Sequence, residues 1–283
     1  MKHLFLSAAC CLLFACSNKV QQENIITVTI EPQRYFVEQL AESLFRVETM
    51  VPTGTSPETY DPTPVQMANL ARSKAYFCIG HIGFEEAWIE RLKENYPKIP
   101  FFDNSTGVSM IELGHYHGDH FHSEGADPHI WSSPKAARKI VRNMCASLIE
   151  IDSENKDQYT ANLKKLLEYI DAVDENITQI LQNSSQKAFI IYHPALSYFA
   201  RDYGLTQYSI EFHGSEPSPE QLKQMIEAAK EIGIKTVFVQ QEFDKKNAEI
   251  IAQELGCQLI TINPLSYDWG EEMINIAQAL SDE

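Results

Sequence analysis

Five of the nine histidines in this 283-residue chain lie within the eighteen residues from Gly114 to Trp131, GHYHGDHFHSEGADPHIW. Neutral imidazole is the commonest side chain that holds zinc, copper or nickel, so this composition indicates a transition metal. His129 stands in a DPHIW context beside apolar residues, which favours a fixed ligand. The other four alternate with Gly, Asp and Ser, and we expect them to form a mobile loop that collects metal ions: His115, His117, His120 and His122.

This stretch has two other possible interpretations. A closed structural zinc site is disfavoured, because neither cysteine pairs nor histidines four residues apart on a helix support the cluster. A solvated polar loop without a metal role stays open, because a His-rich tract is only a compositional signal.

Candidate ligands also stand at the ends of predicted strands, two in each half of the chain. Ligands of parallel sheets bind beyond the carboxyl ends of the strands, so these side chains converge on one cleft if the halves face each other. Singly, each has an ordinary explanation as a turn residue, a solvated acid or a core histidine. Together they make a workable site for a divalent ion: Glu58, His129, His193 and Asn263.

The elements that position these residues alternate between strand and helix, which predicts an α/β fold with parallel sheets. The run from Tyr159 to Leu181 has no Gly or Pro and carries an apolar stripe, so it predicts one long helix of about 34 Å. We therefore expect two lobes, each a roughly four-stranded parallel sheet flanked by helices, joined by one rigid helix. The expected bounds are 25–157 for the N-terminal lobe with a His-rich loop at 114–126, 158–183 for the connecting helix and 184–283 for the C-terminal lobe.

The N-terminus has the features of a bacterial lipoprotein signal. A basic start precedes the apolar run from Leu4 to Ala15, which ends in LFAC. The run is shorter than the about 20 apolar residues that span a bilayer. We predict that residues 1–15 form a signal peptide, that Cys16 is lipidated, and that residues 16–24 tether an exported protein facing the periplasm or cell surface. An ordinary cleaved signal or a buried helix is the alternative.

Charge and cysteine content narrow the class of protein further. The formal net charge is −16, which disfavours nucleic acid as a partner because phosphate binding needs a basic face. Beyond Cys16 only Cys78, Cys145 and Cys257 follow, at wide spacings. Buried free thiols are favoured over a disulfide framework, with one bridge left open.

Several motifs resemble the metal-binding solute-binding proteins of ABC importers, the zinc and manganese uptake family. They are TYDPTP, FEEAW, the His-rich insert running into ADPHIW, the helix beginning QYTANL, and YHPALSYFARDYGL, and they cover nearly the whole chain beyond the signal. The resemblance implies a two-lobe fold with one metal between the lobes, which is delivered to a membrane permease and its ATPase. It also implies a transport receptor rather than an enzyme.

The chain departs from the family at two expected ligands. The family usually has His where Glu58 stands and Asp where Asn263 stands, whereas His129 and His193 are kept. Relative to the family, the carboxylate of the site has thus moved from the C-terminal lobe to the N-terminal lobe, and the ligand set keeps its one negative charge. Keeping this charge matters because an uncompensated buried charge is costly. Asn is a poor zinc ligand, so Asn263 is also a candidate partner of a metal-bound water. Fallback ligands near strand ends are His81, Glu242 and Asp268.

Zinc is the expected cargo, because a His at position 193 and the His-rich insert are features of the zinc branch; Mn²⁺ and Fe²⁺ are the alternatives. A zinc hydrolase is a different class of function that two His, one Glu and an open position would suit. The sequence has no HExxH motif, and a lipid tether with a His-rich stretch suits capture better than turnover. A surface adhesin is a third possibility.

Overall fold

The computed structural model describes residues 24–117, 120–211 and 215–281. The predicted signal peptide and Cys16 lie outside these residues. Within them, no helix combines the length and the apolar character that crossing a membrane requires. The three cysteines of the described chain, Cys78, Cys145 and Cys257, are free, as the sequence predicts.

The N-terminal sheet has four parallel strands in the order β2-β1-β3-β4. The central strands β1 and β3 are fully buried, which is why their sequences IITV and AYFC are apolar throughout or nearly so. The strands are β1 (Ile25–Val28), β2 (Arg46–Thr49), β3 (Ala75–Cys78) and β4 (Phe101–Asp103). The helices of this half are α1 (Glu31–Ala41), α2 (Pro64–Leu70), α3 (Gly83–Asn95) and α4 (Pro134–Ile151).

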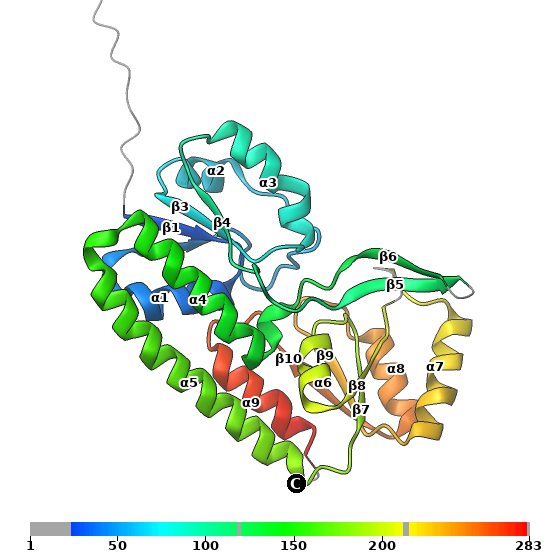
Figure 1. Ribbon diagram of the computed structural model, residues 1–283. Coiled ribbons are helices and arrows are strands. Elements are labelled where there is room, and N and C mark those ends of the chain that lie inside the picture. The colour runs from blue at the N-terminus through cyan, green and yellow to red at the C-terminus, as the bar shows by residue number, and fades with distance from the viewer. Residues whose placement is uncertain (1–23, 118–119, 212–214, 282–283) are drawn as a thin grey trace, which may run out of the picture.

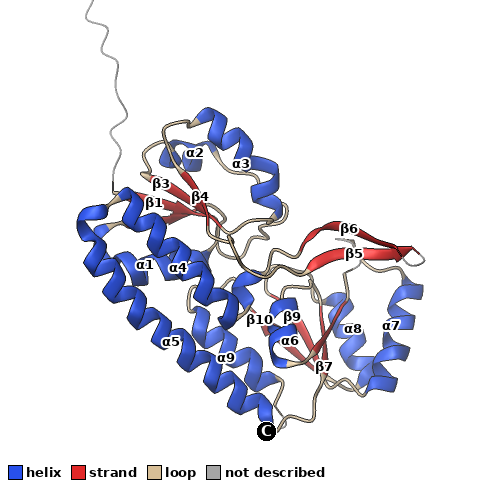
Figure 2. Ribbon diagram, viewed as in Figure 1, coloured by secondary structure: helices blue, strands red, loops and turns tan. Residues whose placement is uncertain are grey.

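The C-terminal sheet repeats this arrangement, with four parallel strands in the order β10-β9-β7-β8. Helices flank this sheet as they flank the first one (Figure 2). Its strands are β7 (Ala188–Ile191), β8 (Thr206–Ser209), β9 (Thr236–Gln240) and β10 (Gln258–Ile262). Its helices are α6 (Ser197–Tyr203), α7 (Pro219–Ile232), α8 (Lys246–Leu255) and α9 (Trp269–Ala279). The predicted fold class, two four-stranded parallel sheets flanked by helices, is confirmed.

One long helix, α5 (Lys156–Gln182, 27 residues), lies along both halves of the molecule (Figure 1). It packs on α1 and α4 of the first half and on α9 of the second. Its buried residues recur every three to four positions, which is the stripe that a helix buries against a core: Tyr159, Asn162, Leu166, Ile170, Val173, Ile177 and Leu181. The predicted connecting helix is confirmed, whereas the exact bounds of the lobes stay a prediction.

The His-rich segment differs from the expected loop. It forms an antiparallel hairpin of β5 (Glu112–His117) and β6 (His120–Ala126), which projects from the first half toward the side of the second sheet (Figure 1). In the backbone register His115 lies opposite His122, and His117 lies opposite His120. The alternation HYH and HFH has the period of two that is typical of strands, and this is the signal that a loop prediction overlooks. A metal-collecting role for these four histidines stays a prediction.

Candidate metal centre

His129 is fixed by the turn that follows β6. The carboxylate of Asp127 accepts a hydrogen bond from the His129 amide at 2.9 Å and contacts its ring Nδ1 at 2.8 Å. Burial by itself lowers the pKa of His129, which is 5% exposed, but the carboxylates around the ring, Asp127 most of all, together outweigh burial and raise that pKa. Because Asp127 favours a proton on Nδ1, the Nε2 lone pair is left for another partner.

His193 follows β7 and has the same arrangement with a different carboxylate. Its Nδ1 lies 2.6 Å from Glu211 Oε2, and Glu211 follows β8, the strand beside β7. The Gln240 side chain accepts from the His193 amide at 3.3 Å and donates to the His193 carbonyl at 2.6 Å. The Phe243 ring stacks on the imidazole at 5.3 Å between centroids. His193 is thus held through its backbone, through the Nδ1 atom of its ring and through one face of that ring.

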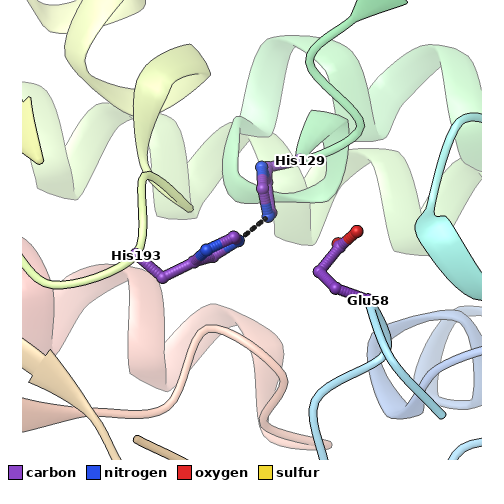
Figure 3. A group of neighbouring side chains, drawn as sticks. All are labelled: Glu58, His129 and His193. Atoms are coloured by element: carbon purple, nitrogen blue, oxygen red, sulfur yellow. Dashed lines mark hydrogen bonds between the residues drawn. The ribbon is translucent and has the colours of Figure 1, made fainter. Parts of the chain in front are cut away.

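The two imidazoles point at each other from opposite halves of the molecule (Figure 3). Their Nε2 atoms are 3.1 Å apart. When both Nδ1 atoms carry protons, two lone pairs face each other at this distance, and such an arrangement needs a proton or a cation between them. A neutral imidazole Nε2 is a common ligand atom for a transition metal.

Glu58 is the third member of this group. Its Oε2 accepts a hydrogen bond from the Gly83 amide at the start of α3 at 3.1 Å, while its Oε1 is buried without a hydrogen-bond partner among the described residues. One ligand atom each from Glu58, His129 and His193 lies within 4.8 Å of the others. The cavity between them is about 20 Å³, which is room for one ion or one water molecule.

Of the four other predicted ligands, two lie at the cavity or next to it and two lie away from it. Glu242 lines the same cavity, its Oε2 is buried without a partner among the described residues, and burial raises its pKa. Asn263 precedes Pro264, which lines the cavity, and the Asn263 side-chain oxygen is likewise buried without a partner in the described chain. His81 and Asp268 are exposed and do not belong to the group of converging ligand atoms.

Sequence reasoning missed three residues that position the predicted ligands. Asp127 and Glu211 orient the histidines, and Gly83 orients Glu58. Glu211 stands just beyond a strand end, which is the signal that selected the ligands themselves. Asp127 is two residues from His129 in the DPH motif. No local signal links Gly83 to Glu58, because the contact depends on how the loop after β2 packs on α3.

Two parallel sheets, one long helix along both, and histidines that converge from the two halves define a two-lobed binding protein of the α/β class. The chain matches the family model described as zinc-uptake complex component A, periplasmic, over residues 26–281. It belongs to that family, whose members are solute-binding proteins of transporters.

Individual relatives support this assignment. The high-affinity zinc uptake system protein ZnuA of Bacillus subtilis is 29% identical over 93% of this chain and 88% of its own length. The zinc-binding lipoprotein AdcA of Streptococcus pneumoniae is also 29% identical over 93% of this chain, which spans 54% of AdcA. A crystal structure of ZnuA superposes with a TM-score of 0.84 at 39% identity, over 92% of this chain and 99% of that one.

Proposed function

We propose that this protein is an extracytoplasmic receptor that captures a divalent transition metal, most favourably zinc, between its lobes and delivers it to the permease of an ABC importer. The observation that carries the proposal is the convergence of His129 and His193, whose Nε2 atoms face each other while carboxylates hold their Nδ1 atoms. Two imidazoles and the carboxylate of Glu58 are a ligand set that suits zinc. The zinc-uptake names of the relatives agree with this cargo.

Capture is better supported than catalysis. A zinc hydrolase keeps a coordination position open to water and substrate. Here the cavity of about 20 Å³ holds little more than the ion itself. The proposal also includes a lipid anchor at Cys16, in keeping with the lipoprotein name of AdcA, and an accessory role in metal collection for the His-rich hairpin.

Metal analysis of the protein purified without chelator tests the function directly. We expect one tightly bound zinc per chain, retained in competition with manganese, and no turnover of ester or peptide substrates. Absence of tight binding of any divalent metal would sink the proposal. Hydrolytic turnover that depends on the metal would instead make the protein an enzyme, and tighter binding of manganese or iron would change the cargo within the same family.

A further inference from the structure

We propose that Glu242 is a ligand of the transported ion, so that the site holds two carboxylates and two imidazoles. The inference rests on the proposed function and deepens it. Four donors is the number that zinc takes in most protein sites, and the converging group of Glu58, His129 and His193 supplies three.

The segment that carries Glu242 is attached to His193 on both sides. Gln240, the last residue of β9, bonds the amide and the carbonyl of His193, and Phe243 stacks on its ring. Glu242 lies between these two anchors and lines the cavity. A carboxylate on a segment so closely tied to a ligand is positioned for the same ion.

Unsatisfied atoms point to a cation at this place. Glu58 Oε1 and Glu242 Oε2 are both buried without a hydrogen-bond partner among the described residues, and both residues line the cavity. Burying an ionised carboxylate oxygen without a partner is costly. A dication satisfies both oxygens and both Nε2 lone pairs at once. Glu242 lines the cavity but is not part of the group whose ligand atoms lie within 4.8 Å of one another, so its carboxylate must turn toward the ion when the ion binds.

Asn263 is the competing donor from the same half, and two arguments favour Glu242. In the order β10-β9-β7-β8, the strand before Glu242 is the neighbour of the strand before His193, whereas the strand before Asn263 is one place farther away. Adjacent strands are about 4.8 Å apart, so Asn263 starts about one strand spacing farther from the imidazole. Ligand chemistry points in the same direction, because a carboxylate is a regular zinc ligand, whereas the side-chain amide of Asn is a poor one.

The second carboxylate also bears on which metal is bound. Oxygen ligands suit harder cations such as Mn²⁺, whereas imidazole suits zinc. With two carboxylates and two imidazoles, the site has ligands for harder cations and for zinc. Loss of Glu242 should therefore weaken manganese binding more than zinc binding.

The experiment compares zinc affinity, measured by competition with a chromogenic chelator, in the full chain and in the variants Glu242→Gln, Asn263→Ala and Glu249→Gln. Glu249 is an exposed acid on α8 and serves as the matched control. We expect Glu242→Gln to lose at least about 100-fold in affinity, beyond the about 10- to 100-fold that loss of an outer contact usually causes. Glu249→Gln should bind like the wild type, and Asn263→Ala should lose less than Glu242→Gln.

The visible absorption of Co²⁺ bound in place of zinc separates ligation from a remote charge effect. Replacement of a carboxylate ligand changes the ligand field, so the spectrum of Glu242→Gln should shift, whereas that of Glu249→Gln should not. A wild type that binds zinc tightly, together with a Glu242→Gln variant of unchanged affinity or unchanged spectrum, overturns this inference and leaves the proposed function standing. A wild type without tight zinc binding overturns the function itself. Should Glu242→Gln fail to fold by circular dichroism, Glu242→Asp, which withdraws the carboxylate by one methylene, replaces it with the same criteria.

Discussion

Both histidines of the site depend on a carboxylate for their orientation. Asp127 holds the His129 ring from two residues away in the chain, whereas Glu211 reaches His193 from the neighbouring strand. Such contacts fix the tautomer and make the ligand nitrogen more basic. Ligand and carboxylate should therefore differ in the size of their effect on metal affinity.

At this scale we predict that His129→Ala or His193→Ala abolishes high-affinity zinc binding while the fold is kept, because each change removes a ligand atom. Asp127→Asn and Glu211→Gln should lower zinc affinity by about 10- to 100-fold and preserve one-to-one stoichiometry. Isothermal titration calorimetry measures both quantities, and circular dichroism checks the fold. Unchanged affinity in either alanine variant would show that the ion binds elsewhere.

The start of α3 is the element that holds Glu58 in place. The Gly83 amide donates to Glu58 Oε2, and the Phe84 amide donates to the Pro57 carbonyl at 2.9 Å. A Cβ at position 83 would lie 2.5 Å from the Glu58 carbonyl oxygen and 2.8 Å from its Oε2. Only glycine permits the loop after β2 to come this close to the helix. The positive end of the helix dipole also favours the carboxylate there.

Gly83→Ala should accordingly displace Glu58 and lower zinc affinity by about 10-fold or more, in the range typical of lost supporting contacts. If the substitution acts through Glu58, it should have little further effect in a protein that already carries Glu58→Gln. Calorimetry on the two single variants and the double variant measures this coupling. Additive losses would mean that Gly83→Ala disturbs the site by another route.

Glu85, also in the first turn of α3, makes the stability of the folded protein depend on pH. Its carboxylate is buried and accepts hydrogen bonds from Thr29 and from the amides of Ile79 and Gly80. Burial raises its pKa to about 7, and the hydrogen bonds limit the rise. The native state thus binds this proton more tightly than the unfolded chain does. The stability that follows is fully present below the ordinary glutamate pKa and is lost as pH rises through about 7.

We predict that the free energy of unfolding of the metal-free protein contains a component of at most about 3 kcal/mol from Glu85, which declines between about pH 4.5 and 7. Glu85→Gln, which keeps the shape but cannot ionise, should remove this component. Urea denaturation at a series of pH values measures it. Identical pH profiles for the wild type and Glu85→Gln would show that Glu85 does not titrate in this window.

The whole molecule is joined by buried contacts between its halves next to the site. The Trp131 indole donates to the Pro264 carbonyl at 2.9 Å, and the Trp269 indole donates to the Trp131 carbonyl at 2.7 Å. Both rings are 1% exposed. Tyr267 also donates to Glu38 of α1 at 2.6 Å. Together with α5, these contacts make the two halves interdependent in stability.

We predict that Trp269→Phe lowers the free energy of unfolding by about 1–3 kcal/mol or more, because the Trp131 carbonyl loses its donor in a buried place and the smaller ring packs less well. Trp88→Phe is the matched control, since its indole donates to Asp61 near the surface, and it should cost less. Chemical denaturation followed by circular dichroism compares them. Equal losses for the two variants would argue against a special role for the contact between the lobes.

The sequence by itself determined the two parallel sheets, the long helix and three converging ligand candidates. These follow from local periodicity and from the rule that carboxyl ends of parallel strands share an edge, so Glu58, His129 and His193 could be selected before any contact was known. Tertiary structure alone decided that Glu211 and Gln240 flank His193, because this depends on β8 and β9 lying on either side of β7. It also decided the approach of Gly83 to Glu58 and the position of Glu242 beside the cavity. Such contacts join residues far apart in the chain. They are determined by strand order and side-chain packing, which the periodicity of the sequence does not encode.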